Sequence, residues 1–170
     1  MKTELTKKLE ESAIKTLKGV GTFLCPEVGI SIYEDKQVVS RNKVTGEEFE
    51  YIFHEKKTEI VDILLWKAGP ETKDGEWRCY EIKITKQDFY SKNAHTFVGN
   101  YNYYIMPMEV YNEVKYDIAD FVGVYTYEEP ITGAWKYIKC IKKPKWRELQ
   151  VSADILKYSM IKSLYRETRG

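Results

Sequence analysis

Two apolar segments of this chain carry acidic side chains where a buried strand normally has none. The first runs from Glu59 to Trp66 and contains Asp62, and the second runs from Trp77 to Ile84 and contains Glu81 and Lys83. Burying a carboxylate is costly unless the group is paired or bound to a metal ion. The linker between the segments has two turn signals, Gly-Pro and Asp-Gly, so the segments are predicted to form one antiparallel hairpin.

The two-residue period of a strand fixes which of these side chains share a face. Glu81 and Lys83 project together, whereas Tyr80 and Ile82 point to the other face. A plausible register places Asp62 opposite Glu81. Two adjacent carboxylates repel each other, and a hard divalent cation with oxygen ligands is the usual resolution. The alternative is a buried ion pair with a hydrogen-bonded Asp62, which needs no metal ion.

The pattern of Asp62 followed by Glu81-Ile82-Lys83 resembles the signature of the PD-(D/E)XK, or restriction-endonuclease-like, nuclease superfamily. The Glu-x-Lys spacing alone is unspecific, because it recurs at four other places in the chain. The resemblance continues through Thr85–Phe89 and Asn100–Pro107, and about residues 1–127 are similar to small bacterial DNA-repair-associated members. Val61 stands where the family name places a proline, a position that varies in the superfamily.

The resemblance implies an α/β fold with a restriction-endonuclease-like core, in which helices flank a mixed central sheet. It also implies a metal-dependent nuclease acting on DNA, with RNA also compatible, in repair, recombination or restriction. Asp62, Glu81 and the carbonyl of Ile82 would hold Mg²⁺ or Mn²⁺, and Lys83 would assist the nucleophile or the leaving charge. A nucleic-acid-binding or assembly module that no longer cuts is the alternative. Within the nuclease class, a junction resolvase acting as a homodimer competes with a repair or restriction-like endonuclease.

Two further carboxylates, Glu10 and Glu27, are candidates for an accessory catalytic role that the resemblance implies. Glu10 lies on the flank of a predicted amphipathic helix in which apolar residues recur every four positions from Leu5 to Leu17. A salt bridge to Lys7 or Lys18 is the simpler role for Glu10. Glu27 begins a predicted strand over residues 27–33, and a solvent-facing position at the strand end is its alternative.

The rest of the chain predicts an order of helix, three strands, helix, strand, helix, strand, then a basic segment and a last helix. The polar stretch 34–54 is expected to be a loop or an excursion hairpin. Thr85 and Asp88 have capping-box spacing at the start of a helix that extends to about Asn93. The later elements are predicted as a strand at 101–107, a crossover helix at 109–118, a strand at 121–127 and a helix at 152–166.

Candidate nucleic-acid contacts fall in two regions. Gln87 and Lys92 can face the site from the helix after the Glu-x-Lys strand, and His95 and Tyr101 are candidates for phosphate contact, although a structural role is the common one for such residues. Residues 136–170 contain ten Lys or Arg and three Asp or Glu, a local charge of +7, which leaves −6 for residues 1–135. A basic segment of this kind favours phosphate. Within it we expect DNA contacts from Lys142, Lys143 and Lys145; a solvated surface is the alternative.

Length and composition indicate a single domain over residues 1–170, 43% of them hydrophobic. The charged amino terminus is unlike a signal peptide, and no apolar run has the length of a membrane span, so we expect a cytoplasmic protein without a membrane partner. Three widely spaced cysteines argue against a disulfide framework or structural zinc. With only two histidines, a metal site must rely on oxygen ligands.

Overall fold

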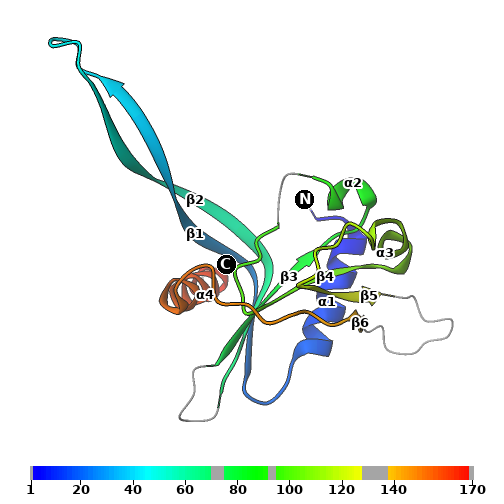
Figure 1. Ribbon diagram of the computed structural model, residues 1–170. Helices are drawn as coiled ribbons and strands as arrows, with labels where there is room; N and C mark the ends of the chain where they lie inside the picture. The colour runs from blue at the N-terminus through cyan, green and yellow to red at the C-terminus, as the bar shows by residue number, and fades with distance from the viewer. Residues whose placement is uncertain (1, 70–74, 92–94, 128–137, 169–170) are drawn as a thin grey trace, which may run out of the picture.

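The computed structural model describes residues 2–69, 75–91, 95–127 and 138–168, and its six strands form one mixed sheet in the order β1 to β6 (Figure 1). The central strands β3, β4 and β5 are parallel to one another, and the remaining neighbours are antiparallel. The strands are β1 (Thr22–Arg41), β2 (Glu48–Lys67), β3 (Glu76–Ile82), β4 (Tyr101–Pro107), β5 (Val122–Tyr127) and β6 (Ile138–Lys142). The helices are α1 (Glu4–Leu17), α2 (Lys86–Phe89), α3 (Met108–Val114) and α4 (Ala153–Glu167). The expected mixed α/β architecture with flanking helices is confirmed.

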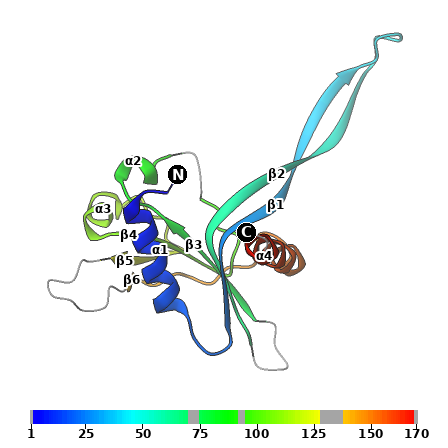
Figure 2. The same cartoon turned by 180° about the vertical axis from the view of Figure 1, so that it is seen from behind.

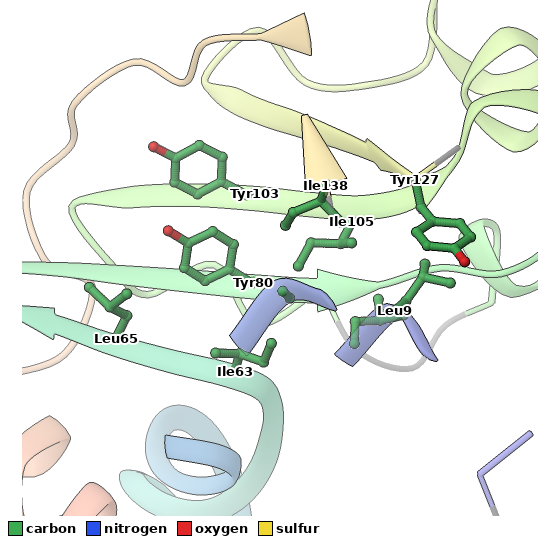
Figure 3. Close-up of a cluster of buried hydrophobic side chains, with 10 residues drawn as sticks. Leu9, Ile63, Leu65, Tyr80, Tyr103, Ile105, Tyr127 and Ile138 are labelled. Atoms are coloured by element: carbon green, nitrogen blue, oxygen red, sulfur yellow. The ribbon is translucent and has the colours of Figure 1, made fainter. Parts of the chain in front are cut away.

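Helix α1 covers one face of the sheet. Its Leu9 and Ala13 are fully buried against a cluster that includes Ile63, Tyr80 and Ile105. Figure 3 shows Leu9 of the helix beside Ile63, Tyr80 and Ile105 of the strands. Because Tyr80 lies in this cluster, the alternation along β3 sends Glu81 to the opposite face, as predicted.

The opposite face is covered by two further apolar clusters. Helix α4 packs Leu156 and Met160 over β1 and β2, and α3 packs with α2 over β4 and β5. Glu81 lies where these clusters meet, because Cys79 on its own strand belongs to the first cluster and its β4 neighbour Tyr104 belongs to the second. The carboxylate is therefore placed in apolar surroundings rather than at the surface.

Strands β1 and β2 continue beyond the sheet as a two-stranded arm that projects from the body (Figures 1 and 2). Residues 34–54 form the outer part of this arm, so the excursion-hairpin alternative is confirmed and the loop alternative is wrong. The arm turns at residues 42–46: the Asn42 side chain accepts hydrogen bonds from the N–H groups of Val44 and Thr45, and Gly46 adopts a φ of 78°. The strand predicted at 27–33 is consequently much longer.

Several element boundaries differ from the prediction for local reasons. Helix α2 ends at Phe89 rather than near Asn93, since the N–H of Ser91 bonds to the carbonyl of Asp88 and tightens the last turn. Helix α3 ends at Val114, whose carbonyl accepts the N–H of Asp117 in the same way. The basic segment contains the edge strand β6. Among the described residues, no helix is long and apolar enough to cross a membrane.

Candidate metal centre

The candidate centre lies where β2 separates from β3. Their pairing ends at Ile63 opposite Tyr80, and one further step of the same register sets Asp62 opposite Glu81. Here the N–H of Ile82 donates to Oδ2 of Asp62 at 2.7 Å, so a side chain continues the strand pairing after the β2 backbone has turned away. The structure therefore brings Asp62 and Glu81 together as the sequence predicted.

Glu81 is fully buried, and neither of its carboxylate oxygens makes a hydrogen bond of normal geometry to a described residue, although the backbone N–H of Thr96 is close enough to lower its pKa. Burial, followed by the charge of neighbouring Asp62, raises the pKa of Glu81 well above its usual range. Burial also raises the pKa of Asp62, although the hydrogen bond from Ile82 opposes this effect. A buried carboxylate without partners costs free energy that only a proton or a cation can offset.

Lys83 is also buried and lies on the face of β3 that carries Glu81. Its Nζ is 3.9 Å from Oδ1 of Asp88. Asp88 is held in place from two sides, because Ile84 N–H donates to its Oδ2 at 3.1 Å and its own N–H donates to Thr85 Oγ1 at 3.0 Å. The predicted Thr85 cap is confirmed, and it fixes the acid beside Lys83.

The donors at this position fit a hydrated hard cation. The carboxylates of Asp62 and Glu81 and the backbone carbonyl of Ile82 supply oxygen, which Mg²⁺ and Mn²⁺ prefer. Across the described part of the chain, no group of three or more His, Cys, Asp or Glu side chains is arranged to hold a metal ion. The proposed centre has only two such side chains, Asp62 and Glu81, and its third ligand is a backbone carbonyl. Few protein ligands suit Mg²⁺, which usually keeps several of its waters. The two buried, unbonded oxygens of Glu81 are the observation in favour of a cation.

Glu10 and Glu27 meet at Lys2, a residue that sequence reasoning missed. Lys2 forms ion pairs with both acids, at 2.8 Å in the case of Glu27, so the expected partners of Glu10 on its own helix are not the ones observed. Lys2 lowers and Glu10 raises the pKa of Asp62, which places this group beside the centre. Nothing near Lys2 in the sequence signals this contact, since it joins the amino terminus to β1.

Glu27 has an unusual backbone. Its φ of 50° is the one positive value among the described residues other than glycine. The pairs Pro26 with Ile63 and Val28 with Val61 flank it, so Glu27 lies opposite Asp62 across β1 and β2. A left-handed residue of this type costs about 1–3 kcal/mol, and such strain concentrates at functional sites.

The candidate nucleic-acid residues near α2 are spread out. Gln87 is exposed on α2, and Lys92 lies outside the described residues. His95 is exposed, and its Nε2 lies 3.1 Å from the Ser91 carbonyl, so this nitrogen is the donor. The other nitrogen, Nδ1, lies 2.6 Å from the hydroxyl of Tyr104. Tyr101 lies under the guanidinium of Arg78, at 5.7 Å from ring centroid to Cζ.

The three lysines of the basic segment lie at the far edge of the sheet, since β6 and β1 are its two outer strands. The Nζ of Lys142 donates to the carbonyl of Ala119 at 2.8 Å, and Lys145 forms an ion pair with Asp120. Lys143 is exposed. The structure does not bring these lysines to Asp62 and Glu81, and their contact with DNA stays a prediction.

Comparisons of the chain with protein-family models, curated proteins and solved structures gave no match. The chemistry open to the site therefore follows from its own side chains: two carboxylates and a carbonyl that can hold a cation, and a buried ammonium beside them.

Proposed function

We propose that this protein is a metal-dependent nuclease that hydrolyses DNA phosphodiester bonds, on a restriction-endonuclease-like fold, in DNA repair, recombination or restriction. The observation that carries the proposal is the buried Glu81 carboxylate, which makes no hydrogen bond of normal geometry through either oxygen and whose pKa responds to the charges of Asp62 and Lys83. A cation bound by Asp62 and Glu81 relieves both the repulsion and the desolvation of these acids.

A purely structural ion pair accounts less well for the same residues. A buried pair between Glu81 and Lys83 offsets its desolvation only when good geometry and further hydrogen bonds satisfy both partners. The oxygens of Glu81 make no hydrogen bond of normal geometry, and Nζ of Lys83, whose charge lowers the pKa of Glu81, also lies 3.9 Å from Oδ1 of Asp88. The ion-pair arrangement therefore offsets only part of the cost of burying Glu81.

Each residue then has a defined role. Asp62, Glu81 and the Ile82 carbonyl would hold Mg²⁺ or Mn²⁺, and the bound ion supplies charge neutralisation and a more acidic water. The Lys83 ammonium orients the attacking water or balances the negative charge that develops on the phosphate, because its burial strengthens its field at short range. Glu10 and Glu27 are accessory groups at the outer side of the centre.

A cleavage assay tests this function. Single-stranded, duplex, flapped and four-way DNA would be incubated with Mg²⁺ or Mn²⁺ and the wild-type, Lys83→Ala, Lys83→Met or Lys86→Ala protein. Lys86 is the matched control because it is close in sequence, half exposed and paired with Glu113. We expect cleavage by the wild type, a loss of about 10²–10³-fold in both Lys83 variants, and little change in Lys86→Ala.

Chelation of the metal should abolish cleavage. If folded wild-type protein cut none of the four substrates with either metal, the chain would instead be a binding or assembly module. If Lys83→Met cut as fast as the wild type, the role given to Lys83 would be wrong.

A further inference from the structure

A cleft of about 620 Å³ opens onto Asp62 between the base of the arm and helix α4. One wall comes from β1 and β2, and the other comes from the last turns of α4, which lies beside the arm in Figures 1 and 2. Glu27 and Asp62 lie at the end of the cleft nearest the candidate metal centre, whereas Lys56, Lys162 and Arg166 supply its positive charge.

These cations are available to a ligand to different degrees. Neither Lys56 nor Lys162 has an ion-pair partner among the described residues, and both are exposed. Many other lysines do pair, including Lys157 on the same helix, which lies 3.7 Å from Asp154. Two unpaired cations on facing walls of one cleft are a site for an anion that spans it.

Arg166 fixes the position of α4 relative to the metal centre. Its guanidinium donates a hydrogen bond to the backbone carbonyl of Glu27 at 3.1 Å, which ties the end of the helix to the strained residue opposite Asp62. The α4 wall of the cleft, which carries Lys162, is therefore held at a defined distance from Glu27 and Asp62. The arm-side wall carries small polar side chains, Ser31 and Thr58, whose hydroxyls can donate to phosphate.

We infer that this cleft binds the sugar-phosphate backbone of one DNA strand and leads it to Asp62. The inference rests on the proposed function and adds the path of the substrate. It places the main phosphate contacts on Lys56 and Lys162, and not on β6, where Lys142 and Lys145 already have partners within the chain.

Equilibrium binding of fluorescently labelled DNA, measured by anisotropy across a series of salt concentrations, tests the path. The buffer contains chelator, so hydrolysis does not affect the reading. The test variant is Lys56→Gln/Lys162→Gln, and the matched control is Lys7→Gln/Lys18→Gln, which removes the same charge from exposed positions on or next to α1.

We expect the cleft variant to bind at least about tenfold more weakly near 0.1 M salt. The slope of log affinity against log salt should become shallower by about 1.8 for duplex or about 1.4 for single strands, since two phosphate contacts are lost. The α1 control should keep the wild-type slope.

Equal losses of DNA affinity in the two variants would mean a general effect of net charge and would overturn the proposal that the cleft binds DNA. A wild type that binds no DNA would overturn it as well. An unchanged slope in the cleft variant, with intact cleavage by the wild type, would overturn the cleft alone. Binding that depends on the cleft, without cleavage by the wild type, would overturn the nuclease function and keep the cleft as a binding site.

Discussion

Replacing Glu81 by Gln should make the metal-free protein more stable. The substitution keeps the size of a side chain that is fully buried and removes a carboxylate whose oxygens have no hydrogen bond. An unsatisfied buried polar group costs about 1–3 kcal/mol, and more when it is charged. The new amide is also imperfectly bonded, so we expect a net gain at neutral pH of about 1–3 kcal/mol. For a chain of this length, that gain corresponds to a rise in Tm of about 2–12 °C.

The gain should depend on pH in a definite direction. Because the pKa of Glu81 is raised on folding, the folded protein holds a proton that the unfolded chain releases above its ordinary pKa near 4.3. Over the window between that value and the raised pKa, the metal-free wild type loses stability as pH rises. Glu81→Gln should remove most of this loss, and a smaller slope should remain from Asp62, whose pKa is also raised.

Thermal and urea unfolding of both proteins in chelator, from pH 4.5 to 8.5, measures this difference. Saturating Mn²⁺ should stabilise the wild type, by about 2.7 kcal/mol at one hundred times its Kd, and leave the variant unchanged. A destabilisation of about 3–5 kcal/mol in Glu81→Gln without metal would show that Glu81 belongs to a buried ion pair, and would refute the reasoning.

Two other substitutions test the surroundings of the centre. Thr85→Ala removes the acceptor of the Asp88 N–H and should cost about 1 kcal/mol in urea unfolding. It should lower turnover but not Mn²⁺ affinity, because Asp88 contacts Lys83 and not the metal ligands; a matching loss of Mn²⁺ affinity would contradict this. Deleting residues 35–54 and closing the arm with a short turn should change stability by no more than about 0.5 kcal/mol, since side chains such as Ile52 and Phe53 are mostly exposed. A fall in Tm that grows with protein concentration would instead mean that the arm packs against a second copy of the chain.

The sequence carried enough information for the hairpin because that hairpin depends on local patterns. The alternation of side chains along residues 77–84 predicted that Tyr80 and Glu81 lie on opposite faces of the sheet. The acids in the two apolar segments predicted the register of the hairpin, and the structure agrees with both. The helix caps were equally local, as at the start of α4, where the hydroxyl of Ser152 accepts the N–H of Ile155. Such features can be predicted correctly from a few neighbouring residues.

The features that the sequence did not predict depend on contacts between distant segments or on weak patterns. The arm has apolar residues at every second position, as in Phe49, Tyr51 and Phe53, but both of its faces meet solvent, so its length was not evident from hydropathy. The contact of Lys2 with Glu10 and Glu27 joins three separate elements. The cleft beside α4 likewise arises only when the helix returns to β1, and no spacing in the sequence encodes that return.

If Asp62 and Glu81 jointly hold one divalent cation, calorimetric titration with Mn²⁺ will detect that site. The wild type and Asp62→Asn/Glu81→Gln would be titrated in two buffers of different ionisation enthalpy at the same pH. We expect one site in the wild type with millimolar or tighter affinity. Binding should release a proton, since the raised pKa of Glu81 leaves that carboxyl partly protonated, and affinity should increase with pH. The double variant should give no binding heat. Equal heats from the two proteins would contradict the claim.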